Sequence, residues 1–279
     1  MRTPEQLKGK IRNVAKEKRL SSQEILQMYL FERVIERLSH TSYKDNFILK
    51  GGFLIASMIG VDARTTMDMD TTIKGLPVEE TAIVKIIKEI LSIDAGDGIE
   101  LSFDRITPIR DDDEYNNYRV YFTANYGKIK NPMKMDITTG DQITPAAIEY
   151  RYHTLFDEED IPVMAYNLET ELAEKYETII SRNIGSTRAR DFYDLYKLFS
   201  IYKNDIDANM LRDAIKKTAS KRGSEREIAE WREICDEIRN SSAMADLWKN
   251  YSSEHVYAES ISFDDIVESL VLFGEMVSV

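Results

Sequence analysis

The chain has 279 residues, 43% hydrophobic and 31% charged, proportions typical of a soluble globular protein with one large domain or two. Its net charge of −12 argues against broad, non-specific coating of nucleic acid, which relies on a basic surface. The negative net charge does not exclude a nucleic-acid substrate that is held by a local basic patch. The segment Lys8–Arg19, with six basic residues and one acidic residue, is either such a patch or a solvated helix face.

Features that the sequence lacks indicate the compartment of the cell in which the protein works and argue against a histidine metal site. No apolar run approaches the roughly 18 residues that cross a membrane, and the N-terminal residues lack the apolar stretch of a signal peptide. The single cysteine, Cys235, excludes an internal disulfide and fits a reducing compartment. His40, His153 and His255 show no metal-ligand spacing. We therefore expect a cytoplasmic protein with no membrane partner.

The N-terminal half alternates in pattern after an initial helical segment. Residues 1–45 are helical in pattern, and the capping box SSQE (Ser21–Glu24) predicts a helix over about 22–39. Strands are then predicted at NFILK, TTMDMDTTIK, IELSFDRI, YRVYFTANY and MKMDIT. Helices are predicted at GGFLIASMI and at PVEETAIVKIIKEILS, the second with a proline in its first turn. The acidic run RDDDEYNN (110–117) is expected to be a solvated turn.

The C-terminal part is helical in pattern, including LETELAEKYETIISRN and RARDFYDLYKLFSIY. Strands followed by helices, without regular βαβ alternation, indicate an α+β fold. We predict a helical N-terminal segment (1–45), a core of strands and helices (46–165) and a helical C-terminal domain (166–279).

Two aspartates lie two positions apart in the predicted strand TTMDMDTTIK. Because side chains alternate along a strand, Asp68 and Asp70 should share one face, with Met67 and Met69 on the other. A half-buried strand with one solvated face explains such alternation without any function. In PMKMDI, Lys134 and Asp136 repeat the pattern. If the two strands are neighbours, three carboxylates cluster, and hard cations such as Mg²⁺ suit such a cluster.

A glycine pair precedes the first of these strands. KGGF (Lys50–Phe53) follows a strand and opens a helix, where glycines let backbone N–H groups approach a phosphate. Glycines at such a turn are commonly steric conveniences. Followed by Asp-x-Asp on a strand, the pair becomes a specific signal for a nucleotide site.

The ordered pattern GGF…RTTMDMD…KMDI…EK…DFYD resembles the AbiEii-type toxin nucleotidyltransferases of bacterial abortive-infection and type IV toxin–antitoxin systems, within the DNA polymerase β-like superfamily. The resemblance covers residues from about 50 to 195. Phe53 departs from the pattern, because family members carry a small or hydroxylated residue there. The matching positions are Gly51, Gly52, Arg64, Thr66, Asp68, Asp70, Lys134, Asp136, Lys175, Asp191 and Asp194.

The resemblance implies a mixed sheet with flanking helices, and a reaction that moves a nucleoside monophosphate from a nucleoside triphosphate to an acceptor. One or two Mg²⁺ ions are expected on Asp68, Asp70 and Asp136. The catalytic residues are expected to be Asp68, Asp70, Asp136, Lys175 and Asp191, with Asp191 as the hypothetical general base. The nucleotide-binding residues are expected to be Gly51, Gly52, Arg64, Thr66, Lys134, Lys175 and Asp194.

The helical lysine can also be judged from its own helix. Lys175 falls within an apolar stripe that includes Leu172, Tyr176 and Ile179. A lysine facing inward needs a negative partner, either a triphosphate or carboxylates, unless it reaches out from the edge of the stripe. Asp191 and Asp194 lie three apart, so they are neighbours on a helix, where the helix dipole also favours acids.

By resemblance, the protein is a bacterial growth-inhibiting toxin whose expected acceptor is tRNA. Its cognate antitoxin need not form a stable complex with it. Two alternatives stay open: a non-catalytic nucleotide- or RNA-binding protein of the same fold, and a nucleotidyltransferase acting on a small molecule or a protein.

Overall fold

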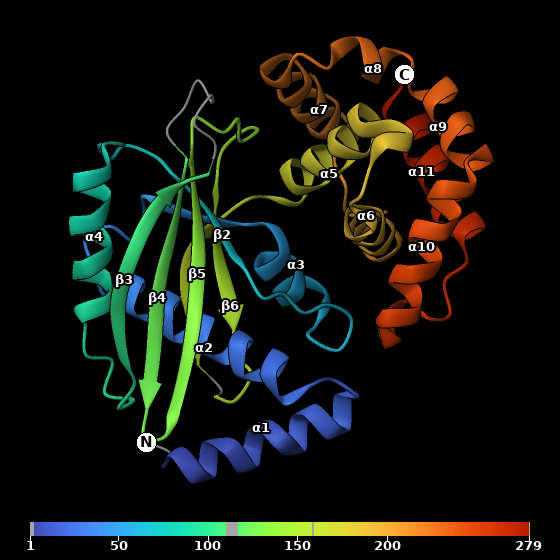
Figure 1. The fold of residues 1–279 in the computed structure, drawn as a ribbon. Helices are drawn as coiled ribbons and strands as arrows, with labels where there is room; N and C mark the ends of the chain where they lie inside the picture. Colours follow the sequence, from blue (N-terminus) through green and yellow to red (C-terminus); the bar gives the residue numbers. More distant parts are fainter. Residues whose placement is uncertain (1–2, 110–116, 158, 279) are drawn as a thin grey trace. The chain divides into compact units, whose positions relative to one another are not determined.

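The computed structural model describes residues 3–109, 117–157 and 159–278. The chain divides into two compact units. The N-terminal unit comprises Met1–Asp141 and Ile148–Ala165, and the C-terminal unit comprises Gln142–Ala147 and Tyr166–Val279. All of the strands of Figure 1 belong to the N-terminal unit.

The N-terminal unit contains four helices and seven strands in its described part. The helices are α1 (Pro4–Lys18), α2 (Ser22–Ser39), α3 (Gly51–Ile59) and α4 (Glu80–Ser92). The strands are β1 (Phe47–Lys50), β2 (Met69–Ile73), β3 (Glu100–Pro108), β4 (Tyr118–Tyr126), β5 (Ile129–Thr139), β6 (Ile148–His153) and β7 (Asp160–Ala165).

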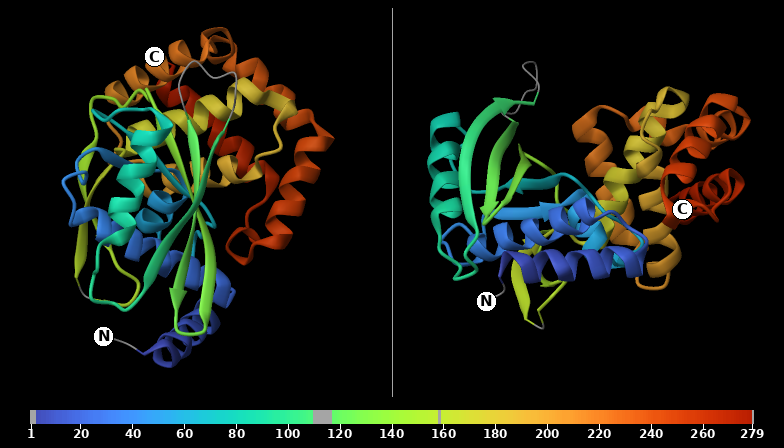
Figure 2. Two further views of the ribbon diagram at one scale, coloured as in Figure 1. Left: turned by 60° about the vertical axis from the view of Figure 1, so that its left-hand side comes forward. Right: turned by 60° about the horizontal axis from the view of Figure 1, so that its bottom comes forward.

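These strands form one mixed sheet in the order β3-β4-β5-β2-β1-β7-β6. The pairs β1–β7 and β2–β5 are parallel, and the other neighbours are antiparallel. Helix α4 packs along β3, α2 packs against α4 and β7, and α1 packs against α2 (Figures 1 and 2). The α+β fold with a mixed sheet and flanking helices is as predicted.

One face of the sheet forms the core under α2 and α4. Val34 and Ile35 of α2 and Ile90 of α4 surround the same small apolar cavity as Met69 of β2 and Met135 of β5. Because successive side chains on a strand point to opposite faces, Asp70 and Asp136 lie on the other face.

Several local predictions hold. The capping box on Ser21 and Glu24 is present and opens α2 at Ser22. Strand β1 ends at Lys50, and α3 starts at Gly51, where the glycine pair was expected to open a helix.

Other local predictions were wrong. Helix α4 begins at Glu80, so Pro77 lies before it and not in its first turn. Met67 is 42% exposed and does not pack with Met69, because β2 begins only at Met69 and the alternation of a strand does not reach Met67. Strands β6 and β7 were not identified. The predicted turn at 110–117 falls on residues outside the described part of the chain, except Asn117.

The C-terminal unit is helical. Its elements are α5 (Leu168–Arg182), a 3-10 turn (Asn183–Gly185), α6 (Ala189–Tyr202), α7 (Ala208–Arg222), α8 (Glu225–Ala229), α9 (Trp231–Asn240), α10 (Ser242–Glu254), a 3-10 turn (Val256–Ala258) and α11 (Phe263–Val277). Helix α5 packs against α6 and α7, and α11 packs against α6 and α9. Phe273 of α11 contacts the rings of Tyr176 (5.0 Å) and Phe199 (5.3 Å) at the centre of this packing.

Across the described residues, no helix combines the length and the apolar character that crossing a bilayer requires.

Candidate active site

Four charged residues line up across four adjacent strands of the sheet. The strand registers pair Lys50 of β1 with Asp70 of β2, Asp70 with Asp136 of β5, and Asp136 with Arg119 of β4. Residues directly opposite each other on neighbouring strands have side chains on the same face. The sequence of charges along this line, which we call the ionic rung, is therefore cation, anion, anion, cation.

Asp136 is held by both of its oxygens. Arg119 Nε donates to Oδ1 and Arg119 Nη2 donates to Oδ2, each at 2.7 Å. This bidentate contact raises the pKa of the Arg119 guanidinium above its ordinary value. Arg119 was not predicted as a site residue, because its role depends on the register of β4 against β5.

Asp68, two residues before Asp70, is paired with Lys134, two residues before Asp136. Lys134 Nζ lies 2.8 Å from Asp68 Oδ1, and the side chains are 37% and 39% exposed, respectively. The backbone N–H of Asp68 donates to Thr66 Oγ1 at 3.2 Å. Lys134 was expected to bind the nucleotide, and in the structure its ammonium neutralises the first of the paired aspartates.

The two glycines at the start of α3 are required by close contacts. Gly51 has φ +65°, and a Cβ there would lie 2.7 Å from Asp70 Oδ2. A Cβ on Gly52 would lie 2.9 Å from Arg64 Nη2 and 3.0 Å from Thr66 Oγ1. The structure thus brings Gly51, Gly52, Arg64, Thr66 and Asp70 together.

The loop that carries Arg64 and Thr66 is fastened to the core. Arg64 is 2% exposed and donates from Nη1 to the Thr65 carbonyl oxygen. Thr65 Oγ1 donates to Glu24 Oε1 at 2.6 Å, and Glu24 belongs to the capping box of α2. The first turn of α2 therefore fixes the loop that leads into Asp68.

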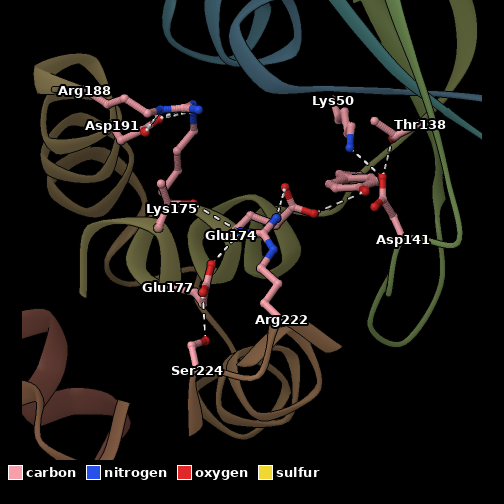
Figure 3. Close-up of polar contacts among 12 residues, drawn as sticks. Lys50, Thr138, Asp141, Glu174, Lys175, Glu177, Arg188, Asp191, Arg222 and Ser224 are labelled. Carbon is pink, nitrogen blue, oxygen red and sulfur yellow. Dashed lines mark hydrogen bonds and ion pairs between the residues drawn. The ribbon is translucent and has the colours of Figure 1, made fainter. Parts of the chain in front are cut away.

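Lys50 has its own carboxylate partner beside the ionic rung (Figure 3). Its Nζ lies 2.5 Å from Asp141 Oδ2, and Thr138 Oγ1 donates to the same oxygen at 2.5 Å. Lys50 and Asp141 are only 11% and 13% exposed. Neither residue was predicted as part of the site, although Lys50 directly precedes the glycine pair.

Phe53 occupies the position at which the family pattern has a small or hydroxylated residue. It is fully buried and packs against the rings of Phe31 (5.3 Å) and Tyr152 (4.9 Å). Its place in the core explains why a large apolar residue is tolerated at the first turn of α3.

The remaining predicted site residues form a cluster in the C-terminal unit (Figure 3). Lys175 Nζ on α5 lies 2.9 Å from Asp191 Oδ1 on α6, a contact drawn in Figure 3. The same Nζ lies 3.1 Å from Asp194 Oδ2. Arg188 Nε donates to Asp191 Oδ2 at 2.5 Å. Lys175 is 12% exposed and the two carboxylates are 3% and 0% exposed, so the negative partner that the inward lysine requires comes from this chain.

The pKa values of Asp191 and Lys175 decide whether this cluster can act as a general base. Burial alone would raise the pKa of Asp191, but the charges of Lys175 and Arg188 outweigh burial and bring it to about 2. Burial would lower the pKa of Lys175, and the charges of Asp191 and Asp194 raise it instead. Both groups are thus firmly charged at neutral pH, and a carboxylate with so low a pKa is a weak general base.

The carboxylates of this region can hold Mg²⁺ only together with other ligands. No group of three or more acidic, histidine or cysteine side chains within the described ranges is arranged as a metal cage. Mg²⁺ is usually held by one or two carboxylates together with substrate phosphates and water, so a complete protein cage is not required. Asp68 and Asp70 supply suitable hard oxygens, with Asp136 in register beside Asp70.

Comparisons with known proteins agree with this fold. The structure is similar to JHP933 from Helicobacter pylori, at TM-score 0.54 and 16% identity, over 92% of this chain and 91% of that one. It is also similar to a putative nucleotidyltransferase from H. pylori, at TM-score 0.51 and 14% identity, over 92% and 96% of the two chains. No curated protein matches the sequence.

The model of one protein family, described as the nucleotidyl transferase AbiEii toxin of type IV toxin–antitoxin systems, matches residues 33–269. This match spans most of the chain and includes every residue of the ionic rung and of the Lys175 cluster. The chain therefore belongs to the AbiEii nucleotidyltransferase toxin family.

Proposed function

We propose that this protein transfers a nucleoside monophosphate from a nucleoside triphosphate to an RNA acceptor, with tRNA as the expected acceptor. The observation that carries the proposal is the ionic rung beside the N-terminus of α3, where Gly51 and Gly52 let the side chains of Asp70 and Thr66 lie close to the helix backbone. Backbone N–H groups at a helix N-terminus bind phosphate readily.

In the proposed reaction, the oxygen of the acceptor hydroxyl forms a bond to the α-phosphorus. The bond from that phosphorus to the β-phosphate oxygen breaks, and pyrophosphate leaves with the electron pair. The hydroxyl proton passes to a carboxylate. When bound to Asp68, Asp70 and Asp136, one or two Mg²⁺ ions supply neutralisation of the charge that builds up on the phosphate oxygens.

The chain's own residues orient the reactants. Gly51, Gly52 and Thr66 line the phosphates, and Lys50 adds positive charge at the end of β1. Arg119 fixes the orientation of Asp136 through its bidentate contact, so we assign it a positioning role. Lys134 holds Asp68 in the same way until a stronger cation replaces it.

For the C-terminal cluster, we propose that Lys175 supplies positive charge during transfer and that Asp191 and Asp194 hold its ammonium. The low pKa of Asp191 does not favour the general-base role that the sequence suggested. If Asp191→Asn lowers transfer without changing the pH profile, Asp191 positions Lys175. Loss of the acidic limb of the profile, where a general base becomes protonated, would instead support the general base.

The direct test is transfer of label. Purified protein, Mg²⁺ and each α-labelled nucleoside triphosphate are incubated with total bacterial tRNA, and the variant Asp70→Ala is run in parallel. Asp246→Ala, which removes an exposed carboxylate of α10, is the matched control. We expect label on RNA with the wild type and the control, and none with Asp70→Ala.

Nucleotide binding without labelled RNA would contradict the RNA acceptor and direct the search to small-molecule or protein acceptors. The absence of any product in such a screen would favour a non-catalytic nucleotide-binding protein. For the biological role, we propose a cytoplasmic toxin that limits bacterial growth during phage infection. Its cognate antitoxin would counteract it without forming a stable complex. Growth arrest on expression of the wild type, but not of Asp70→Ala, is the expected result.

A further inference from the structure

Helix α1 presents a line of positive charge that the proposed reaction does not use. Lys8, Arg12 and Lys16 recur every four residues, so they lie along one side of the helix, and Arg19 follows at its C-cap. Lys8 is half-buried and the other three are exposed. We call these four residues the basic stripe. The acidic residues of α1 are Glu5, in the first turn, and Glu17, which directly follows Lys16.

The basic stripe is not neutralised by the protein. Within the described residues, none of its four side chains has an ion pair or a hydrogen bond, in a chain whose net charge is −12. The other two cations of this segment differ: Lys10 Nζ donates to the Phe156 carbonyl oxygen at 2.9 Å, and Lys18 Nζ lies 3.4 Å from Asp62 Oδ1. Like charges four residues apart on a helix destabilise it by about 0.2–0.5 kcal/mol per pair, so an external anion would stabilise this arrangement.

Gly9 gives a second, independent indication of a ligand. It lies in the interior of α1, where glycine destabilises a helix by about 0.5–1 kcal/mol relative to alanine. A Cβ at this position would meet no atom within 4 Å, so packing within the protein does not require glycine here. A glycine beside Lys8 leaves the backbone open to close approach from outside.

We propose that the basic stripe and Gly9 bind the phosphate backbone of the RNA acceptor, away from the nucleotide that reacts. The identity of this RNA rests on the proposed function. The contact between Lys18 and Asp62 ties the end of α1 to the loop that continues through Arg64 and Thr66 to Asp68. The helix that would hold the RNA is thereby linked to the carboxylates through residues 62–68 of the same unit.

The apolar side of α1 argues against a membrane as the occupant. Helices that lie on membranes bury an exposed apolar face in the lipid. In α1, Leu7, Ile11 and Ala15 are 1%, 4% and 3% exposed, and the helix packs against α2. No aromatic side chain lies in Pro4–Lys18 to anchor a protein partner. A phosphate backbone requires only cations and access, which the basic stripe supplies.

The test uses two full-length variants with the same change in net charge. The first replaces the stripe (Lys8→Gln, Arg12→Gln, Lys16→Gln, Arg19→Gln). The control replaces four exposed lysines elsewhere, at Lys44, Lys85, Lys216 and Lys249, also with glutamine. Binding of labelled total bacterial tRNA is measured over a range of salt concentrations, and circular dichroism confirms that both variants keep the wild-type helix content.

We expect the stripe variant to bind tRNA at least about tenfold more weakly. The slope of log K against log salt should fall by about 3, since each phosphate contact contributes about 0.7–0.9. The control should keep the wild-type slope. In transfer assays, the KM for RNA should rise while nucleotide binding stays unchanged. Gly9→Leu, which blocks close approach without removing charge, should weaken binding with little change in slope.

Equal binding by the stripe variant and the control would overturn the inference. Stripe-dependent binding of vesicles of phosphatidylglycerol and phosphatidylcholine, without binding of tRNA, would overturn it as well. The proposed function can fail separately: stripe-dependent tRNA binding without any transfer of label would preserve the surface and contradict the reaction.

Discussion

The ionic rung of the N-terminal unit and the Lys175 cluster of the C-terminal unit both pair carboxylates with cations, but at different depths. Asp136 of the rung and its neighbour Asp68 are 17% and 39% exposed, whereas Asp191 and Asp194 are 3% and 0% exposed. Exposed pairs contribute little to stability and can exchange partners readily, while a buried pair cannot lose one member without leaving a charge uncompensated. Exposed carboxylates are therefore free to accept a new cation, and the buried ones are committed to Lys175.

The largest effect on stability is expected from removing the buried lysine. Lys175→Met leaves Asp191 and Asp194 without their shared cation and should lower the free energy of unfolding by about 3–5 kcal/mol. Urea denaturation measures this change. Lys217→Met is the control, because Lys217 pairs with Asp213 at about half exposure, and it should change stability by less than about 1 kcal/mol. Equal losses would show that depth does not distinguish the two kinds of pair.

A pH dependence should follow from Asp191. Its pKa is lowered from 3.8 to about 2, so its contribution to stability is complete above pH 3.8 and is lost as the pH falls toward 2. The contribution is about 2 kcal/mol. Unfolding free energies measured across the acid range should show this loss in the wild type, and the corresponding loss should be absent from Asp191→Asn. An unchanged acid limb in that variant would contradict the assignment.

Substitutions at two glycines, Gly51 and Gly96, allow the effect of backbone strain to be measured apart from the effect of a contact with the site. Gly51 and Gly96 have similar φ values, +65° and +69°, but a Cβ on Gly96 would meet no atom within 4 Å, whereas one on Gly51 would meet Asp70. Gly96→Ala should therefore lower stability by about 1 kcal/mol through strain alone. Gly51→Ala should lower it by a further 1 kcal/mol or so and should abolish transfer. Thermal denaturation and the label assay measure the two effects.

The smallest effect on stability is expected at the ionic rung and its neighbour. Lys134→Gln and Arg119→Gln should each change the unfolding free energy by less than about 1 kcal/mol, because the side chains of both cations are more than one-third exposed. Arg119→Gln should still lower transfer, since Asp136 loses its orientation. A loss of several kcal/mol would assign the rung a structural role, in contrast with the comparison above.

The local parts of the site could be predicted from the sequence, and its pairings could not. Asp68, Asp70 and the glycines fall within 20 residues of one another, on a helix and at the start of the strand that follows it, so their spacing alone indicates a phosphate site. Arg119 was missed because only the register of β4 against β5 brings it to Asp136. The partner of Lys175 could be predicted as negative, but which carboxylates it meets is decided by the packing of α5 on α6.

The fold shows the same division between local and long-range information. The capping box at Ser21 correctly predicted the start of α2 because all of its contacts are within four residues. Strands β6 and β7 were overlooked, although IEYRYH alternates apolar and charged residues in the manner of a strand. Their place at the edge of the sheet, beside β1, follows from a parallel pairing between residues far apart in the chain.

The ionic rung also has a consequence for the order in which the protein becomes active. Its members come from strands that end near residues 50, 73, 126 and 139, so the line of charges exists only after all four strands have paired. Pairings between distant segments form late in folding, because each must first overcome the entropy of closing a loop. A chain emerging from the ribosome therefore carries no assembled site until β5 has been made. Synthesis and folding together thus delay the assembly of the site.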